Sequence, residues 1–349
     1  MSIVAETYQY LVGVDTHAAT HTLAVINAGS GALIATDTFP TSPAGLNRAV
    51  TWIKKRTNGS TLLVVEGVGA YGALFTRVAV TAGYQVVEPF PTPAQIRRGR
   101  GKTDRLDAAW IAESVRAADT TELRQPRCDE PIRKALQVLV NARDMINLER
   151  TRAINQLTAL IRTTGLGVDA RQHLTEKQIT QIAAWHISAN ADAASYARRE
   201  ATRLARRVLA CNKDLAVNEK DLLQQVAAHP GGCLLDMFGV GPISAATIIV
   251  AWSHPGRIRS KAAFSALAGV SPIPASSGNT DRHRLNRGGD RRLNRALAAI
   301  VRTRLAKDPA TQAYQAKRTA EGHTSPEIRR ILKNYVARQV FKKLASITI

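Results

Sequence analysis

The chain has 349 residues, and its 48 lysines and arginines outnumber its 27 aspartates and glutamates, which gives a formal net charge of +21. A charge of this sign and size favours a nucleic-acid partner, because each phosphate that a cation neutralises releases condensed counterions. No apolar stretch approaches the roughly 20 residues that a membrane-spanning helix requires, which argues against a membrane protein.

The N-terminal residues lack the charged start and apolar core of a signal peptide. The three cysteines (Cys128, Cys211 and Cys233) have no metal-ligand spacing and cannot all pair as disulfides. We therefore expect reduced thiols in a cytoplasmic protein.

Residues 9–118 are predicted to form an α/β domain. Strand patterns occupy residues 11–14, 22–26 and 32–39, and a helical pattern follows at 46–56. A strand at 62–65, a helix at 74–82 and a strand at 84–87 come next, before a helix that carries Asp104 and is expected to run through Ala118. This order of elements is typical of a ribonuclease-H-like fold.

Four acidic residues in this region are candidates for a metal site. Asp15 and Glu66 each follow an apolar strand, and Asp104 and Asp107 have the spacing that places two side chains on one helix face, about 5–6 Å apart. Carboxylates that converge repel one another, and Mg²⁺, which prefers hard oxygen ligands, removes that repulsion. The pattern predicts one or two Mg²⁺ ions, with Mn²⁺ as an alternative, and phosphoryl-transfer chemistry.

Neighbours of these acids allow two interpretations. His17 would contact a metal or phosphate, or else hydrogen-bond beside the site, and Tyr71 would stack on a base or pack under the sheet. A basic run before Asp104 is expected to contact a nucleic-acid backbone: Arg97, Arg98, Arg100 and Lys102.

Residues 131–228 are almost wholly helical in pattern, with a glycine break at 165–167. One set of residues alternates by four and three, as in the seam of a coiled coil: Leu204, Val208, Cys211, Leu215, Asn218 and Leu222. The seam would pack either within the chain or between chains, and its asparagine would fix the register.

The C-terminal third begins with Gly239 and Gly241 ahead of a predicted helix at 243–252. This pattern resembles a helix-hairpin-helix element, in which the exposed backbone N–H groups at a helix start hold a phosphate. The other interpretation is a simple turn between two helices.

A polar loop with Ser276 and Ser277 is a second candidate for chemistry. A serine hydroxyl can attack phosphorus when it is activated, and the forked donors of arginine bind phosphate well. Six arginines follow the loop: Arg282, Arg284, Arg287, Arg291, Arg292 and Arg295. Alternatively, this is a flexible loop beside a nucleic-acid-binding helix.

Together, the ordered motifs resemble the DEDD transposases of the insertion-sequence 110 family, which includes the Piv-type DNA invertases. The motifs are GVDTH, VEGVGAYG, KTDRLDA, GVGPISAA, AGVSPIPASSG and NRGGDRRLNRAL. The resemblance covers nearly the whole chain, although the middle helices match in character more than in residues.

The resemblance implies three domains: a RuvC-like DEDD domain at 1–125, a helical coiled-coil linker at 126–229 and a C-terminal transposase domain at 230–349. In this family the tetrad matching Asp15, Glu66, Asp104 and Asp107 holds Mg²⁺, and a serine forms a covalent protein–DNA intermediate. The residue before the glycine is Ser277, with Ser276 as the alternative because the serine is doubled.

The resemblance also implies partners and a location. These are double-stranded DNA at the element ends and the target, a structured guide (bridge) RNA, and a homodimer or homotetramer in the bacterial cytoplasm, at the nucleoid. The alternative function is a RuvC-like Holliday-junction resolvase, or nuclease, that hydrolyses DNA with metal-activated water.

Overall fold

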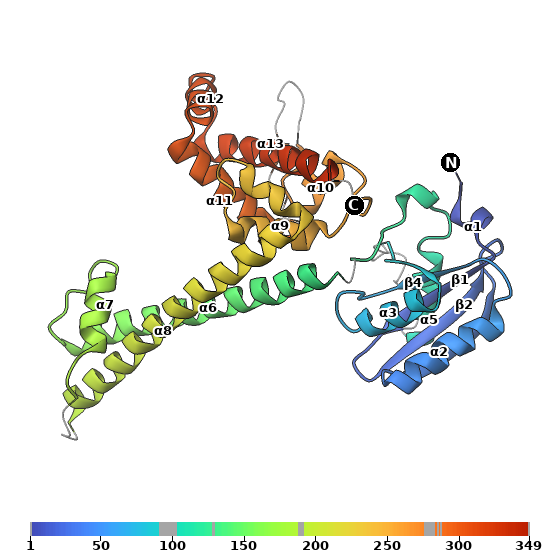
Figure 1. Ribbon diagram of the computed structural model, residues 1–349, viewed down its shortest axis with the longest axis horizontal. Coiled ribbons are helices and arrows are strands. Elements are labelled where there is room, and N and C mark those ends of the chain that lie inside the picture. The colour runs from blue at the N-terminus through green and yellow to red at the C-terminus, as the bar shows by residue number, and fades with distance from the viewer. Residues whose placement is uncertain are drawn as a thin grey trace. The chain divides into compact units, whose positions relative to one another are not determined.

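The N-terminal strands form one mixed sheet in the computed structural model (Figure 1). The structure describes residues 2–90, 103–127, 130–187, 192–275, 283–284, 286 and 288–347. The sheet has the strand order β3-β2-β1-β4-β5. Its strands are β1 (Tyr10–Thr16), β2 (Thr20–Asn27), β3 (Leu33–Pro40), β4 (Thr61–Val65) and β5 (Gln85–Val87).

The pairing directions of these strands agree with the predicted ribonuclease-H-like order. β1, β2 and β3 form an antiparallel meander, and β4 and β5 add in parallel on the other side of β1. The residues after β1 and β4 therefore lie at the same edge of the sheet, because parallel neighbouring strands end together. The fold is consistent with an α/β ribonuclease-H-like N-terminal domain.

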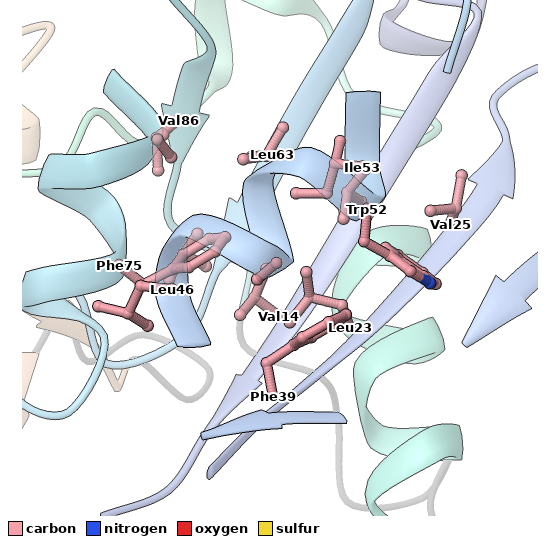
Figure 2. Close-up of a cluster of buried hydrophobic side chains, with 14 residues drawn as sticks. Val14, Leu23, Val25, Phe39, Leu46, Trp52, Ile53, Leu63, Phe75 and Val86 are labelled. Atoms are coloured by element: carbon pink, nitrogen blue, oxygen red, sulfur yellow. The ribbon is translucent and has the colours of Figure 1, made fainter. Parts of the chain in front are cut away.

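Helices cover both faces of the sheet. On one face, α2 (Pro43–Arg56) and α3 (Ala73–Thr81) bury an apolar core that includes Val14, Trp52 and Phe75 (Figure 2). On the other face, α5 (Asp104–Glu113) packs over Leu11 and its neighbours. Successive residues of β1 thus alternate between the two layers, as a pleated strand requires. The short elements α1 (Val4–Thr7) and η1 (Thr120–Glu122) complete this part.

The predicted extent of α5 through Ala118 is wrong, because the helix ends at Glu113. Beyond this point, the carbonyl groups of Arg116 and Ala118 accept hydrogen bonds from the backbone N–H groups of Ala5 and Val4. The N-terminal segment thus provides the partners that a further helical turn would have supplied.

The chain divides into two compact units, one comprising Met1–Asp129 with Gly256–Arg259 and the other comprising Glu130–Pro255 with Ser260–Ile349. The second unit is largely helical. It consists of α6 (Pro131–Thr164), α7 (Glu176–Ala183), α8 (Ala193–Ala228), η2 (Pro230–Asp236), α9 (Pro242–Trp252), α10 (Lys261–Leu267), β6 (Ile273–Pro274), β7 (His283–Arg284), α11 (Arg291–Lys307), α12 (Pro309–Ala320) and α13 (Ser325–Ala345).

The long helices α6 and α8 lie side by side (Figure 1). The predicted seam on α8 is buried at Leu204, Val208, Cys211, Asn218 and Leu222, and it packs within the chain against α6. The Asn218 amide donates to the carbonyl oxygen of Leu139 on α6 at 3.0 Å, and its Oδ1 accepts from Arg143. An asparagine satisfied across the pair disfavours shifted registers, because a shift would leave its polar group unpaired.

The glycine break lies where it was predicted, since α6 ends at Thr164 and Gly165, whose φ is +60°, caps it. None of the helices in the described ranges combines the length and apolarity needed to cross a bilayer. The predicted middle and C-terminal regions share one compact unit, because α9 packs against α6, α8 and α11.

Candidate functional site

Helix α5 approaches the central strand β1 at a glycine. A Cβ on Gly13 would lie 1.9 Å from the backbone carbonyl oxygen of Ala108 and 2.6 Å from the backbone nitrogen of Ala112. No side chain fits in that space, so backbone packs directly on backbone. This close approach brings the first turn of α5 to the end of β1, where Asp15 lies.

The first turn of α5 carries two of the predicted acids, Asp104 and Asp107. Thr103 caps the helix, since its side-chain oxygen accepts a hydrogen bond from the Leu106 N–H. The positive end of the helix dipole favours carboxylates at these positions. The local sequence therefore offsets part of the repulsion between the two acids.

Asp15, His17 and Asp104 converge. The imidazole Nε2 of His17 lies 3.2 Å from a carboxylate oxygen of Asp15 and 3.8 Å from one of Asp104. Each of the three residues offers one ligand atom, and these atoms all lie within 4.8 Å of one another. The interpretation of His17 as a hydrogen-bonded neighbour of the site agrees with this geometry, and its position also permits contact with a metal.

Asp15 is the buried member of the group, with 7% of its surface exposed. Burial raises the pKa of its carboxyl, His17 lowers that pKa, and the negative charges of Asp107 and Asp104 raise it further. Asp107 is thus close enough to Asp15 for the two charges to interact. A buried carboxylate beside two others is costly unless a cation accompanies it.

Glu66 directly follows β4, next to Asp15 on the neighbouring strand. Its backbone N–H donates to the Val14 carbonyl at 3.1 Å, and its carbonyl accepts from the Thr16 hydroxyl. Its side chain is exposed and lies outside the group of ligand atoms formed by Asp15, His17 and Asp104. The structure therefore places the Glu66 backbone at the site, while its role as a ligand stays a prediction.

The loop after Glu66 is tight. Gly67 has a φ of +62°, and its carbonyl accepts hydrogen bonds from the N–H groups of Ala70 and Gly72. Tyr71 in this loop is 61% exposed, so it does not pack under the sheet.

The donor set fits a divalent cation. Asp15, Asp104 and Asp107 supply hard carboxylate oxygens of the kind Mg²⁺ prefers, and an adjacent imidazole is a ligand that Mn²⁺ also accepts. The buried Asp15 carboxylate favours a bound cation, because the negative charges of Asp104 and Asp107 lie close enough to act on it.

Several predicted residues lie outside the described part of the chain. They are Arg97, Arg98, Arg100, Lys102, Ser276, Ser277, Arg282 and Arg287. The strands that precede and follow the two serines, β6 and β7, pair as an antiparallel hairpin.

The remaining arginines of the basic run differ in their surroundings. Arg292 and Arg295 on α11 form ion pairs with Asp144 of α6, at 2.7 and 3.5 Å, so they hold the two helices together. Arg284 on β7 and Arg291 at the start of α11 are exposed. Nucleic-acid binding by these residues stays a prediction.

Gly239 and Gly241 occupy the turn before α9. Gly239 has a φ of +82°, and a Cβ there would lie 3.3 Å from the Ile300 carbonyl oxygen on α11. Gly241 caps α9, and a Cβ there would meet nothing within 4 Å. Gly239 thus has a packing role, whereas the open start of α9 leaves room for the predicted phosphate contact.

Two features escaped sequence reasoning. The first is the close approach at Gly13, for which the only signal is a glycine inside a strand pattern. The second is a basic cavity lined by residues of α13, including Lys333 and Arg338. Its signal is the density of cations in IRRILKNYVAR, although sequence alone does not place them beside Arg284.

In comparisons with known proteins, two family models match separate parts of the chain. A model of the IS110-type DEDD domain, described as a transposase, matches residues 12–165 and so includes the four acids. A model described as "Transposase IS116/IS110/IS902 family" matches residues 232–316, which include the two serines.

Curated relatives are similar over most of their length. The insertion element IS110 uncharacterized 43.6 kDa protein of Streptomyces coelicolor is 25% identical over 315 residues, which cover 76% of this chain and 77% of the relative. The insertion element IS900 uncharacterized 42 kDa protein of Mycobacterium paratuberculosis is 25% identical over 360 residues, covering 89% of each chain.

Proposed function

The chain belongs to the IS110 family of transposases, and from this premise we propose that it cuts and rejoins DNA through a covalent serine–DNA linkage. The proposal is supported above all by the buried Asp15 carboxylate, which lies with His17, Asp104 and Asp107 at the end of the central strand. Membership of a transposase family and a cluster of acids on a strongly basic chain both favour phosphoryl transfer on DNA.

Asp15, Glu66, Asp104 and Asp107 are the proposed ligands of one or two Mg²⁺ ions, or of Mn²⁺. A bound ion would polarise the scissile phosphate and stabilise charge on the leaving oxygen. The protein contributes the rigid placement of its ligands, since Asp15 is held on β1 and the two helix acids are held by the contact of α5 with Gly13.

Ser277 is the proposed nucleophile, with Ser276 as the alternative. The serine Oγ forms a bond to phosphorus while the bond from phosphorus to the 3′ oxygen breaks. The serine gives up its proton, and the 3′ oxygen gains one and leaves as a hydroxyl, so charge and atoms balance. A 3′ hydroxyl of another strand can then attack the 5′-phosphoserine linkage and release the serine.

The net charge of +21 supports a large nucleic-acid surface. We propose that this surface binds the double-stranded DNA of the element ends and target, and a structured guide RNA. RNA that copurifies with the protein and maps to the DNA flanking its gene tests the guide; copurification of no such RNA from active protein counts against it.

We further propose that the chain works as a homodimer or homotetramer in which the acids of one subunit and the serine of another act on the same phosphodiester. The test mixes chains carrying Asp15→Asn with chains carrying Ser277→Ala, each inactive alone. Recovery of strand cleavage in the mixture supports shared sites, whereas no recovery in a confirmed mixed oligomer argues against them.

The rival function is hydrolysis by a resolvase or nuclease that uses water at the acids alone. It predicts that Ser277→Ala leaves cleavage intact. The transposase proposal predicts that this substitution abolishes cleavage, while Ser346→Ala, which removes an exposed hydroxyl just after α13, leaves Mg²⁺-dependent cleavage measurable.

A further inference from the structure

A cavity of about 790 Å³ opens in the helical unit beside the β6–β7 hairpin. Residues from distant parts of the sequence line it, among them Val270, Arg284, Lys333, Tyr335 and Arg338. A volume of this size is in the range of pockets that hold a small molecule or a nucleotide.

The wall next to the hairpin is held by backbone contacts. Gly269 (φ +63°) and Gly289 (φ +86°) pack against each other, since a Cβ on Gly289 would lie 2.5 Å from the Gly269 nitrogen. The side chains of Asn294 and Asn334 donate hydrogen bonds to the carbonyl oxygens of Ala268 and Val270. This wall is therefore preorganised.

The cavity is strongly cationic. The side chains of Arg338 and Arg284 form no hydrogen bond or ion pair with any other residue that the structure describes. Lys333 donates to the Asn294 amide oxygen at 3.0 Å, and burial, followed by the charge of Arg330, lowers the pKa of its ammonium group. These cations are crowded without an adequate counter-charge.

Acidic residues do not supply that counter-charge. Glu327 is the one carboxylate among the described residues that line the cavity, and it accepts hydrogen bonds from Thr324 and lies 3.9 Å from Arg330. Arg318 is already paired with Glu321. Arg284, Lys333 and Arg338 thus remain available to an anion, and forked guanidinium donors suit phosphate oxygens.

An aromatic ring lies beside these cations. Tyr335 is 50% exposed and meets Tyr314 edge-on, with ring centroids 6.0 Å apart and an interplanar angle of 87°. Its ring is fixed by this contact while part of its surface stays open. Cations for a phosphate and an aromatic ring for a base are the two components of single-strand nucleic-acid sites.

We propose that this cavity binds one nucleotide of a single DNA strand, with its phosphate on Arg284, Lys333 and Arg338 and its base against Tyr335. The sequence between β6 and β7 contains the two serines, and under the proposed function the bound strand is the one that a serine attacks. That the strand is the one being cut rests on the proposed function; that the cavity takes a nucleotide does not.

The test measures binding of a short fluorescein-labelled single-stranded oligodeoxynucleotide to the full chain by anisotropy, in EDTA so that no cleavage occurs. Tyr335→Leu should weaken binding on the order of tenfold, the expected effect of losing one base stack. Arg338→Met should weaken binding and lower the slope of log affinity against log salt by about 0.7, the value for one phosphate contact with a single strand.

Matched controls separate the cavity from general electrostatic attraction. Tyr196→Leu removes a half-exposed tyrosine on α8, and Arg302→Met removes an exposed arginine on α11 outside the cavity. The proposal expects small effects from both. Equal losses for Arg302→Met and Arg338→Met, with none for Tyr335→Leu, would overturn it.

Photo-crosslinking locates the base. An oligodeoxynucleotide with 5-iododeoxyuridine should crosslink to the peptide that contains Tyr335, and the crosslink should be lost in Tyr335→Leu. Crosslinks only elsewhere, or crosslinks at Tyr335 with an RNA of the same sequence but not with the DNA, would refute a DNA-strand site. Because no step requires Ser277 or a metal, these outcomes are independent of whether the serine forms a covalent link.

Discussion

Substituting Gly13 by alanine tests whether the contact between α5 and β1 holds the acids together. The new Cβ would lie 1.9 Å from the Ala108 carbonyl oxygen, whereas real Cβ contacts are not shorter than 3.0 Å. Helix α5 must therefore move outward by at least the difference, and Asp104 and Asp107 move with it. Overpacking of this kind costs about 1–3 kcal/mol of unfolding free energy.

The functional loss should exceed what the loss of stability explains. A displacement of about 1 Å in a catalytic group can lower a rate on the order of 100-fold. Chemical denaturation gives the free energy of unfolding, calorimetry with Mg²⁺ gives metal affinity, and cleavage of an element-end duplex gives activity, all below the unfolding transition of Gly13→Ala.

The matched control is Gly29→Ala in the turn between β2 and β3, where a Cβ would meet only the Asn27 side chain at 3.5 Å. It should leave all three quantities near their original values. Ala108→Gly should not restore Gly13→Ala, because the clash is with a backbone oxygen. Unchanged stability, metal affinity and activity in Gly13→Ala would refute the reasoning.

Three further predictions concern single side chains. Burial raises the pKa of the Asp15 carboxyl above its ordinary value of 3.8, so the metal-free protein loses stability as the pH rises from 3.8 towards that higher pKa. Asp15→Asn should therefore be more stable than the original chain at neutral pH without metal. Mg²⁺ should stabilise only the original chain, and thermal unfolding measures both effects. His17→Ala should raise the Mg²⁺ or Mn²⁺ concentration for half-maximal cleavage roughly tenfold, with exposed His173→Ala as the control, and an unchanged requirement would exclude His17 from the site. Burial lowers the pKa of His229 below 6.5, and its Nδ1 accepts a hydrogen bond from the Gly231 N–H, so its contribution to stability is complete above pH 6.5 and is lost as the pH falls below that value. His229→Gln should remove this pH dependence of the unfolding free energy. The same dependence on pH in both chains would contradict this role of His229.

The sheet and the positions of the acids followed from the sequence because both depend on local patterns. Apolar strands at 11–14 and 62–65 ended in Asp15 and Glu66, and the parallel pairing of these strands placed both residues at one edge. The i, i+3 spacing placed Asp104 and Asp107 in one helical turn. Periodicity does not fix side-chain direction beyond a strand end, which is why the exposed Glu66 side chain could not be anticipated.

Other features depend on contacts between distant segments. The end of α5 is set by hydrogen bonds to Val4 and Ala5, and the burial of the α8 seam is set by α6, although a repeat of four and three does not specify which helix or which chain covers it. The basic cavity joins residues near 270, 284 and 335, and no spacing rule connects them.

The central claim is that the acids hold metal ions while a serine breaks the DNA. The most direct measurement uses a nicked element-end duplex that traps the cut strand, followed by denaturing electrophoresis and mass spectrometry. We predict a DNA 5′ end linked to the peptide that contains Ser277, formed only with Mg²⁺ or Mn²⁺ and absent in Asp15→Asn. Metal-dependent cleavage that leaves a free 5′ phosphate and no protein adduct would contradict this claim.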